Sequence, residues 1–129
     1  MIARDASPST RSFADGACAV EDCYVPRLKQ ERHAHPYTDL SLVLAGSVEE
    51  TVGGALERAY ALSVVIKPGG TEHANQYGAR GARIFSVLFE PELAASMKEW
   101  EPGLGRWRWV HGGECVHSAR IFVQSRMEE

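Results

Sequence analysis

Short apolar runs separated by glycine and proline occupy the chain from residue 17 to residue 89. The longest of these runs are residues 17–25, 40–45, 62–66 and 83–89. Residues 47–52 alternate instead, with Glu50 on the same face as two valines, and Gly53-Gly54 then predicts a turn. Short strands at a spacing of roughly ten residues, with turn residues between them, are typical of an all-β sandwich or barrel.

Beyond Phe89 the pattern becomes helical. Glu90-Pro91-Glu92 predicts a helix start, because proline fits the first turn and acidic residues suit the N-terminal end of the helix dipole. A second helical stripe follows Gly112-Gly113 and consists of Val116, Ala119, Val123 and Met127. This apolar stripe is expected either to pack on the barrel or to meet the helix of a partner, which would make a homodimer.

These patterns predict three parts in one small domain of 129 residues. Residues 1–15 are expected to be a flexible N-terminal tail or a first strand, residues 16–110 a β-barrel, and residues 111–129 a C-terminal helical segment.

Composition narrows the classes of partner. The formal net charge is −3 and the 14 basic residues are scattered, which argues against direct binding of nucleic acid by this domain. No apolar run approaches the roughly 20 residues of a membrane span, and the N-terminus lacks the apolar stretch of a secretory signal. Three cysteines without regular spacing favour small packed thiols over disulfides or a zinc knuckle, so a cytoplasmic location is expected.

The candidate chemistry lies in the segment from His33 to Asp39. On an extended strand, His33, His35 and Asp39 would share one face, with the two histidines about 7 Å apart. His73 could add a third imidazole from a neighbouring strand, and such a set suits a divalent transition metal such as zinc, iron, nickel or manganese. The alternative is a polar pocket that binds an organic ligand through hydrogen bonds. Further candidates for ligand binding beside the predicted metal ligands are Tyr37 and Asn75.

These residues resemble the two motifs of the cupin superfamily. The first motif is matched by His33, His35, Asp39 and Gly46, with aspartate in place of the usual glutamate. The second motif is matched by Pro68, Gly70 and His73. The resemblance implies a double-stranded β-helix, or jelly-roll barrel, followed here by one or two C-terminal helices. Besides Asp39, the chain departs from the family pattern at three further positions, where Arg27 and Leu62 replace glycines and Tyr77 replaces an asparagine.

Within the superfamily, residues 40–47, 64–75 and 81–85 look like the N-terminal sensor domain of AraC-type transcription regulators. That resemblance implies a domain that binds a small-molecule effector and forms dimers without catalysis. In such regulators a C-terminal pair of helix-turn-helix motifs binds DNA, and we expect this domain to have no DNA-binding domain of its own. The alternative is a stand-alone metal-dependent cupin enzyme of the dioxygenase, isomerase or decarboxylase type, acting on a small-molecule substrate. The sequence identifies no catalytic nucleophile or acid–base pair that would select a reaction.

Overall fold

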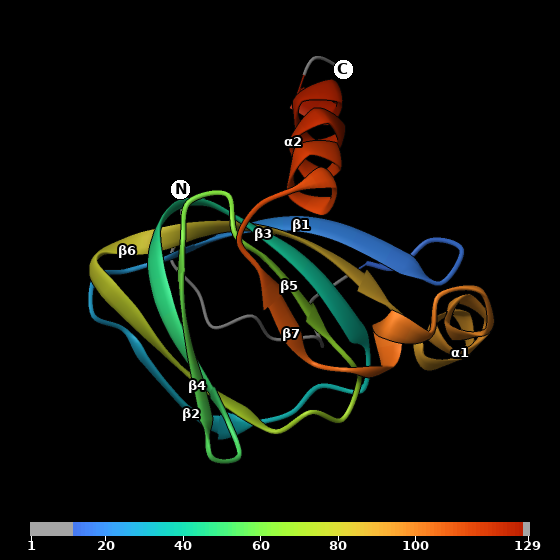
Figure 1. Cartoon of the computed structure of the whole chain (residues 1–129), viewed down its shortest axis with the longest axis horizontal. Helices are drawn as coiled ribbons and strands as arrows, with labels where there is room; N and C mark the ends of the chain where they lie inside the picture. Colours follow the sequence, from blue (N-terminus) through green and yellow to red (C-terminus); the bar gives the residue numbers. More distant parts are fainter. Residues whose placement is uncertain (1–11, 128–129) are drawn as a thin grey trace.

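The computed structural model describes residues 12–127. They form a β-barrel, and the helices come from the C-terminal part of the chain (Figure 1). The strands are β1 (Ala17–Tyr24), β2 (Lys29–His33), β3 (Thr38–Val52), β4 (Ala55–Tyr60), β5 (Val64–Lys67), β6 (His73–Phe89) and β7 (Arg108–Val110). The helices are α1 (Pro91–Trp100), the short 3₁₀ helix η2 (Pro102–Gly105) and α2 (Glu114–Met127). Most of the N-terminal part expected at 1–15 lies outside the described residues.

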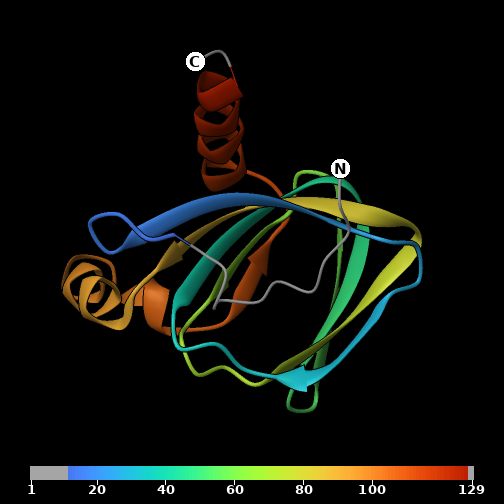
Figure 2. The same ribbon diagram turned by 180° about the vertical axis from the view of Figure 1, so that it is seen from behind.

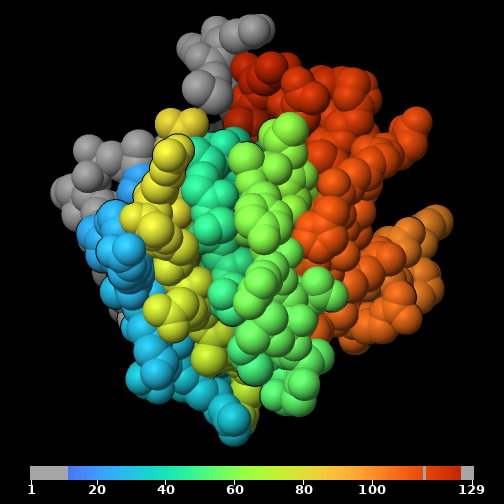
Figure 3. Space-filling model, turned by 60° about the vertical axis from the view of Figure 1, so that its left-hand side comes forward, coloured from blue at the N-terminus to red at the C-terminus, as the bar shows by residue number. Residues whose placement is uncertain are grey.

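The strands form one antiparallel sheet that curls on itself. Its central path runs β1-β6-β3-β5-β7, while β2 pairs with β6 and β4 pairs with β3. Seen from behind, β1 runs beside β6, and β3 and then β5 follow as the next strands of the curled sheet (Figure 2). The outer surface appears as adjacent bands of β6, β3 and β4 (Figure 3). The expected jelly-roll barrel with C-terminal helices is thus confirmed.

Two strands are much longer than the apolar runs suggested. Residues 40–45 and 47–52 belong to the single strand β3, and residues 83–89 are only the second half of β6. The prediction of separate strands was wrong because Gly46 bends β3 without ending it. Gly46 has a φ of +80°, and a Cβ there would lie 2.0 Å from the carbonyl oxygen of Gly81. The register between β3 and β6 shifts around this point, and the two strands remain paired on both sides of the bend.

The helical stripe of α2 packs on the barrel. Val116 and Val123 are buried in a cluster with Leu42 of β3 and Val64 of β5, and Ala119 packs against the same cluster. The side chain of Met127 lies outside the described part of the chain. Burial of this stripe by the barrel favours the first of the two alternatives for α2, because the same valines are then not free to meet a partner helix.

The lack of a long apolar run in the sequence predicts that no helix spans a membrane. Within residues 12–127, neither α1 nor α2 is long and apolar enough to cross a lipid bilayer.

Candidate metal centre

Three histidines meet at one end of the barrel interior. His33 is the last residue of β2, His73 is the first residue of β6, and the two strands pair them directly. His35 lies in the connection between β2 and β3. The expectation that His33, His35 and Asp39 share one extended strand was wrong, because the chain leaves β2 after His33 and begins β3 at Thr38. The pairing of β2 with β6 and the bend at Pro36-Tyr37 bring the three imidazoles together instead.

The geometry of the imidazoles suits a single metal ion. One ring nitrogen from each of His33, His35 and His73 lies within 4.8 Å of the others. Ring centroids are 4.3 Å apart for His33 and His73 and 4.9 Å apart for His33 and His35. Because metal–imidazole bonds are about 2.0–2.1 Å long, ligand nitrogens around one ion lie within about 4.2 Å of one another. Small side-chain rotations would bring the three nitrogens into that range.

The backbone orients two of these rings in the same way. The Nδ1 atom of His33 lies 2.6 Å from the carbonyl oxygen of Glu31, and the Nδ1 atom of His73 lies 2.9 Å from that of Thr71. A carbonyl oxygen accepts only, so each Nδ1 carries the proton and each Nε2 keeps its lone pair. Metal-binding histidines are held by such contacts in proteins generally. The donor set therefore fits a divalent transition metal, with Nε2 as the ligand atom of His33 and of His73.

Tyr37 lies beside the third imidazole. Its ring stacks on that of His35, with centroids 5.0 Å apart and planes at 7°. Tyr37 is also buried, at 5% exposure, and packs in a cluster with Cys18 and Leu88. Of the two expected ligand-binding neighbours, Tyr37 thus packs against His35, while Asn75 of β6 donates a hydrogen bond to Glu50.

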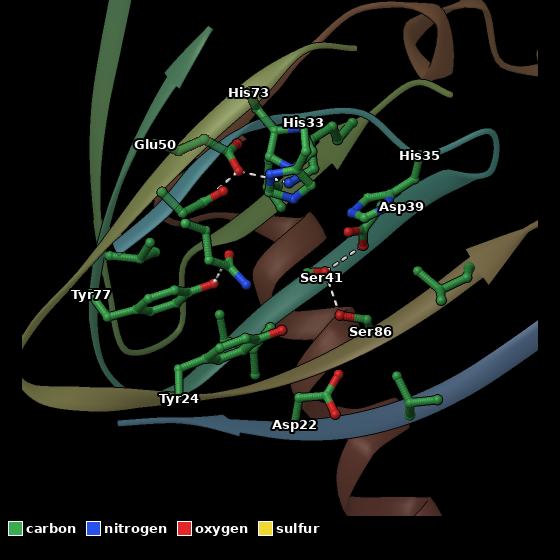
Figure 4. A pocket seen from close by; sticks show the side chains of 18 of the residues that line it. Asp22, Tyr24, His33, His35, Asp39, Ser41, Glu50, His73, Tyr77 and Ser86 are labelled. Carbon is green, nitrogen blue, oxygen red and sulfur yellow. Dashed lines mark hydrogen bonds and ion pairs between the residues drawn. The ribbon is translucent and has the colours of Figure 1, made fainter. Parts of the chain in front are cut away.

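Asp39 lines the same cavity but lies outside the group of three clustered nitrogens. Its Oδ1 accepts a hydrogen bond from the hydroxyl of Ser41, two residues along β3. The Ser41 hydroxyl also lies 2.6 Å from that of Ser86 on β6. Figure 4 shows this short polar chain below the histidines. Asp39 is therefore near the candidate metal centre and held by a hydroxyl group.

A buried ion pair dominates the interior next to the histidines. Glu50 of β3 is 1% exposed, and its Oε2 accepts hydrogen bonds from Lys67 Nζ at 2.7 Å and Asn75 Nδ2 at 3.0 Å. Its Oε1 accepts from Trp107 Nε1 at 2.7 Å and Trp109 Nε1 at 3.2 Å. Four donors satisfy the carboxylate, as a buried charge requires.

Sequence reasoning missed the role of Glu50 and Lys67. The signal was present in the alternation of residues 47–52, which places Glu50 on the same face as Val48. A carboxylate among inward-facing apolar residues requires a buried partner, and Lys67 is the cation that follows the next apolar run. Neither feature identifies the two indole donors, because Trp107 and Trp109 are distant in sequence.

Electrostatics hold this pair fully charged. Burial alone would raise the pKa of Glu50, but the ammonium of Lys67 and the surrounding hydrogen-bond donors lower it from 4.5 to about 2. Burial would lower the pKa of Lys67, but the charges of Glu50 and Asp39 outweigh it and raise this pKa. Burial and Lys67 together lower the pKa of His73 to about 4. The histidine is thus neutral, as a metal ligand must be.

The far side of the cavity carries two tyrosines. The rings of Tyr24 and Tyr77 stack with centroids 4.3 Å apart, and the Tyr77 hydroxyl donates to Gln30 Oε1 at 3.0 Å. Burial, followed by the neighbouring Tyr24 and Glu50, raises the pKa of Tyr77 well above 10. Tyr77, which stands where the family has asparagine, is therefore a neutral hydrogen-bond donor within the barrel.

The cavity is small and rich in carboxyl groups. Its free volume is about 50 Å³. The described charged residues that line it, other than histidine, are Asp22, Asp39, Glu50 and Lys67. Since carboxyl groups outnumber ammonium groups here, a divalent cation at the histidines would improve the charge balance of the interior.

Two unusual backbone positions match the family pattern. Arg27 has a φ of +61° and Leu62 a φ of +77°, and these are the positions at which cupins often have glycine. Left-handed conformations therefore occur at both positions although glycine, the residue that adopts them most easily, is absent from them.

No protein-family model matches the sequence, and a search of curated proteins finds no match. Solved structures do match. The cupin domain of Cnp3 from Schizosaccharomyces pombe has a TM-score of 0.58 and 16% identity, covering 68% of this chain and 66% of that one. A variant of oxalate decarboxylase from Bacillus subtilis has a TM-score of 0.54 and 18% identity, covering 66% of this chain and 23% of that one.

A second oxalate decarboxylase, from Lactobacillus farciminis in complex with formate, has a TM-score of 0.53 and 22% identity and covers 59% of this chain. Another matching structure of the Bacillus subtilis enzyme is described by its Mn(II) centres. The chain spans about a quarter of the length of these decarboxylases. Identities at this level carry information about the fold, and together with the observed strand order they establish that this chain has the fold of a cupin domain.

Proposed function

We propose that this domain binds a divalent transition metal through His33, His35 and His73 and uses the ion to bind a small-molecule effector. The observation that carries the proposal is the convergence of three imidazoles, two of them with Nδ1 held by a backbone carbonyl, inside a barrel. Asp39 lines the same cavity and is the proposed fourth ligand, released from Ser41 when the ion binds. Three or four protein ligands leave open positions for an effector in an octahedral shell.

The remaining interior groups favour binding over catalysis. General acid–base catalysis works best when the pKa of the catalytic group lies near the operating pH. Glu50 has a pKa of about 2, that of Lys67 is raised above its usual value, and that of Tyr77 lies well above 10. These three groups therefore hold their protonation states at neutral pH and serve as fixed charges and hydrogen-bond donors.

We further propose that the domain is the effector sensor of an AraC-type transcription regulator. The support for this finer assignment is the resemblance of residues 40–47 and 64–75 to such sensors, together with a helix that leaves the barrel after β7. A cavity of about 50 Å³ accommodates an ion and a ligand of a few atoms, which limits the effector to a small molecule.

A metal-dependent enzyme is the second candidate function. The observation that favours it is the likeness to oxalate decarboxylases, one of which is described by its Mn(II) centres. Turnover of a small substrate by the metal-loaded protein would decide for this candidate, whereas tight binding without turnover would decide for the sensor.

The metal content of untagged protein, purified without chelator, tests the site directly. We expect about one equivalent of a transition metal in the wild type and none in the His33→Ala, His73→Ala double variant. The matched control is the His111→Ala, His117→Ala double variant, because both of these histidines lie outside the cavity lining. A wild type that takes up no zinc, iron, nickel or manganese would overturn the proposal, as would equal metal content in all three proteins.

A further inference from the structure

The two oxygens of the Glu50 carboxylate accept hydrogen bonds from different segments of the chain. Oε2 accepts from Lys67 and Asn75, which belong to the cavity wall on β5 and β6. Oε1 accepts from Trp107 and Trp109, which lie on the chain segment that leads to α2, and Trp109 also lines the cavity. One buried carboxylate therefore joins the interior of the barrel to its C-terminal segment.

Beyond the two indole hydrogen bonds, that segment is attached to the barrel through β7, through Val110, which packs against the cluster of Leu42 and Val64, and through His111, whose Nδ1 lies 2.7 Å from the Ser63 hydroxyl. β7 spans only Arg108–Val110 and lies at the end of the sheet order, paired with β5 alone. The indole N–H groups of Trp107 and Trp109 bond the segment to Glu50 at 2.7 and 3.2 Å. α2 starts at Glu114, four residues after β7, so a shift of β7 also moves the start of the helix. A short edge strand of this kind exchanges and moves more easily than the central strands.

The candidate metal centre lies within electrostatic reach of Glu50. Glu50 and Lys67 line the same cavity as the three histidines, and Figure 4 shows Glu50 beside His73. A divalent cation held by the three histidines would attract the Glu50 carboxylate and repel the Lys67 ammonium. The ion therefore competes with the indole N–H groups for the negative charge of Glu50, which weakens the bonds from Trp107 and Trp109.

We propose that Glu50 couples occupancy of the metal centre to the position of β7 and the start of α2. This inference rests on the proposed function, since it needs an ion at the three histidines, and it adds the route by which binding would be signalled outside the barrel. Glu50 is a positioning residue in this account, and the two indole N–H groups are the contacts that change. The direction of the change is a loosening of β7 when the ion binds.

Hydrogen exchange of the full chain, measured by mass spectrometry with and without Zn²⁺, tests the coupling. In the wild type we expect Zn²⁺ to speed exchange of backbone amides from Trp107 to the first turn of α2 by about tenfold, the factor expected for loss of one hydrogen bond to a charged group. Amides of β1 (Ala17–Tyr24) serve as the internal reference, because β1 contributes no contact to the Glu50 carboxylate.

The Trp107→Phe, Trp109→Phe double variant removes both N–H donors and keeps most of the aromatic packing. We expect it to bind Zn²⁺ by calorimetry, to show faster exchange in β7 without the ion, and to lose the further response to Zn²⁺. The matched control is Trp100→Phe, because Trp100 is 89% exposed on α1 and should leave the response intact.

The outcomes separate the two proposals. If wild-type protein binds Zn²⁺ and exchange in β7 stays the same, the coupling is overturned while the metal site stands. The coupling is equally overturned if the double variant keeps the full response. If the wild type binds no Zn²⁺ at all, the metal site and the coupling are both wrong. The measurement on the wild type decides the matter even if the double variant does not fold.

Discussion

Glu50 and Lys67 form an ion pair inside the barrel, with Nζ and Oε2 2.7 Å apart and side-chain exposures of 1% and 10%. Each charge is costly to bury alone, so each side chain depends on the other for its place in the fold. The pair also fixes the electrostatic environment of the three histidines.

The pair should make the stability of the protein depend on acidic pH. Because folding lowers the pKa of Glu50 from 4.5 to about 2, its contribution is complete above pH 4.5 and is lost as the pH falls from 4.5 toward 2. The full contribution is of the order of 3 kcal/mol. Urea unfolding in the presence of a chelator should therefore show a gap between wild type and Glu50→Gln that is large at pH 6 and narrows toward pH 2.5. A gap that does not change with pH would contradict the prediction.

Removal of the cation should also destabilise the protein strongly. Lys67→Met leaves Glu50 charged and buried without its ammonium partner, and we expect a loss of about 3–5 kcal/mol in the free energy of unfolding. The Glu50→Gln, Lys67→Met double variant should recover part of this loss, because neither charge remains. Equilibrium unfolding of the two single variants and the double variant gives the coupling energy. Simple additivity of the two losses would mean that the pair is not energetically coupled.

Substitutions of Asp39 and of its hydrogen-bond partner Ser41 test whether Asp39 is a metal ligand. Asp39→Asn should weaken Zn²⁺ binding by about 10–100-fold, whether the carboxylate ligates the ion directly or stabilises its charge. Ser41→Ala removes the hydrogen bond that holds Oδ1 and should strengthen binding if the carboxylate turns to the ion. Calorimetric titration with Zn²⁺ measures both. Unchanged affinity in Asp39→Asn would remove Asp39 from the ligand set.

The left-handed turns at Arg27 and Leu62 are places where glycine should stabilise the protein. A non-glycine residue at φ values of +61° and +77° costs roughly 1–2 kcal/mol, part of which is offset by the higher chain entropy of unfolded glycine. We expect Arg27→Gly and Leu62→Gly each to raise the free energy of unfolding by about 0.5–1 kcal/mol. The matched control is Leu56→Gly on β4, where the side chain is 54% exposed and the substitution should destabilise. Thermal unfolding that shows all three variants destabilised would refute the argument.

Gly46 should tolerate no side chain. A Cβ at this position would lie 2.0 Å from the carbonyl oxygen of Gly81, and φ is +80°. Gly46→Ala must therefore shift the bend of β3 against β6, and we expect a loss of several kcal/mol or failure to fold. Gly53→Ala is the comparison, since its φ is also positive but the space around it is open, so only about 1–2 kcal/mol should be lost. Similar stability of the two variants would show that the close approach at Gly46 is unimportant.

The sequence by itself determined the class of the fold and most residues of the candidate metal centre. Alternating and short apolar runs between glycines and prolines suffice to predict a β-barrel, because strand periodicity and turn chemistry are local properties of the chain. His33, His35 and His73 stand out because imidazoles are uncommon and their spacing matches a known motif. Positive φ at Arg27 and Leu62 was not expected from the sequence, because neither residue type favours that conformation.

Only the tertiary structure decided how these residues meet. Pairing of β2 with β6 joins His33 to His73 across forty residues, and the bend at Gly46 makes one strand out of two expected ones. The contacts from Trp107 and Trp109 to Glu50 join residues more than fifty positions apart. Long-range pairing depends on the closure of the whole barrel, which a local pattern does not encode, and for that reason the buried carboxylate and its link to α2 became visible only in three dimensions.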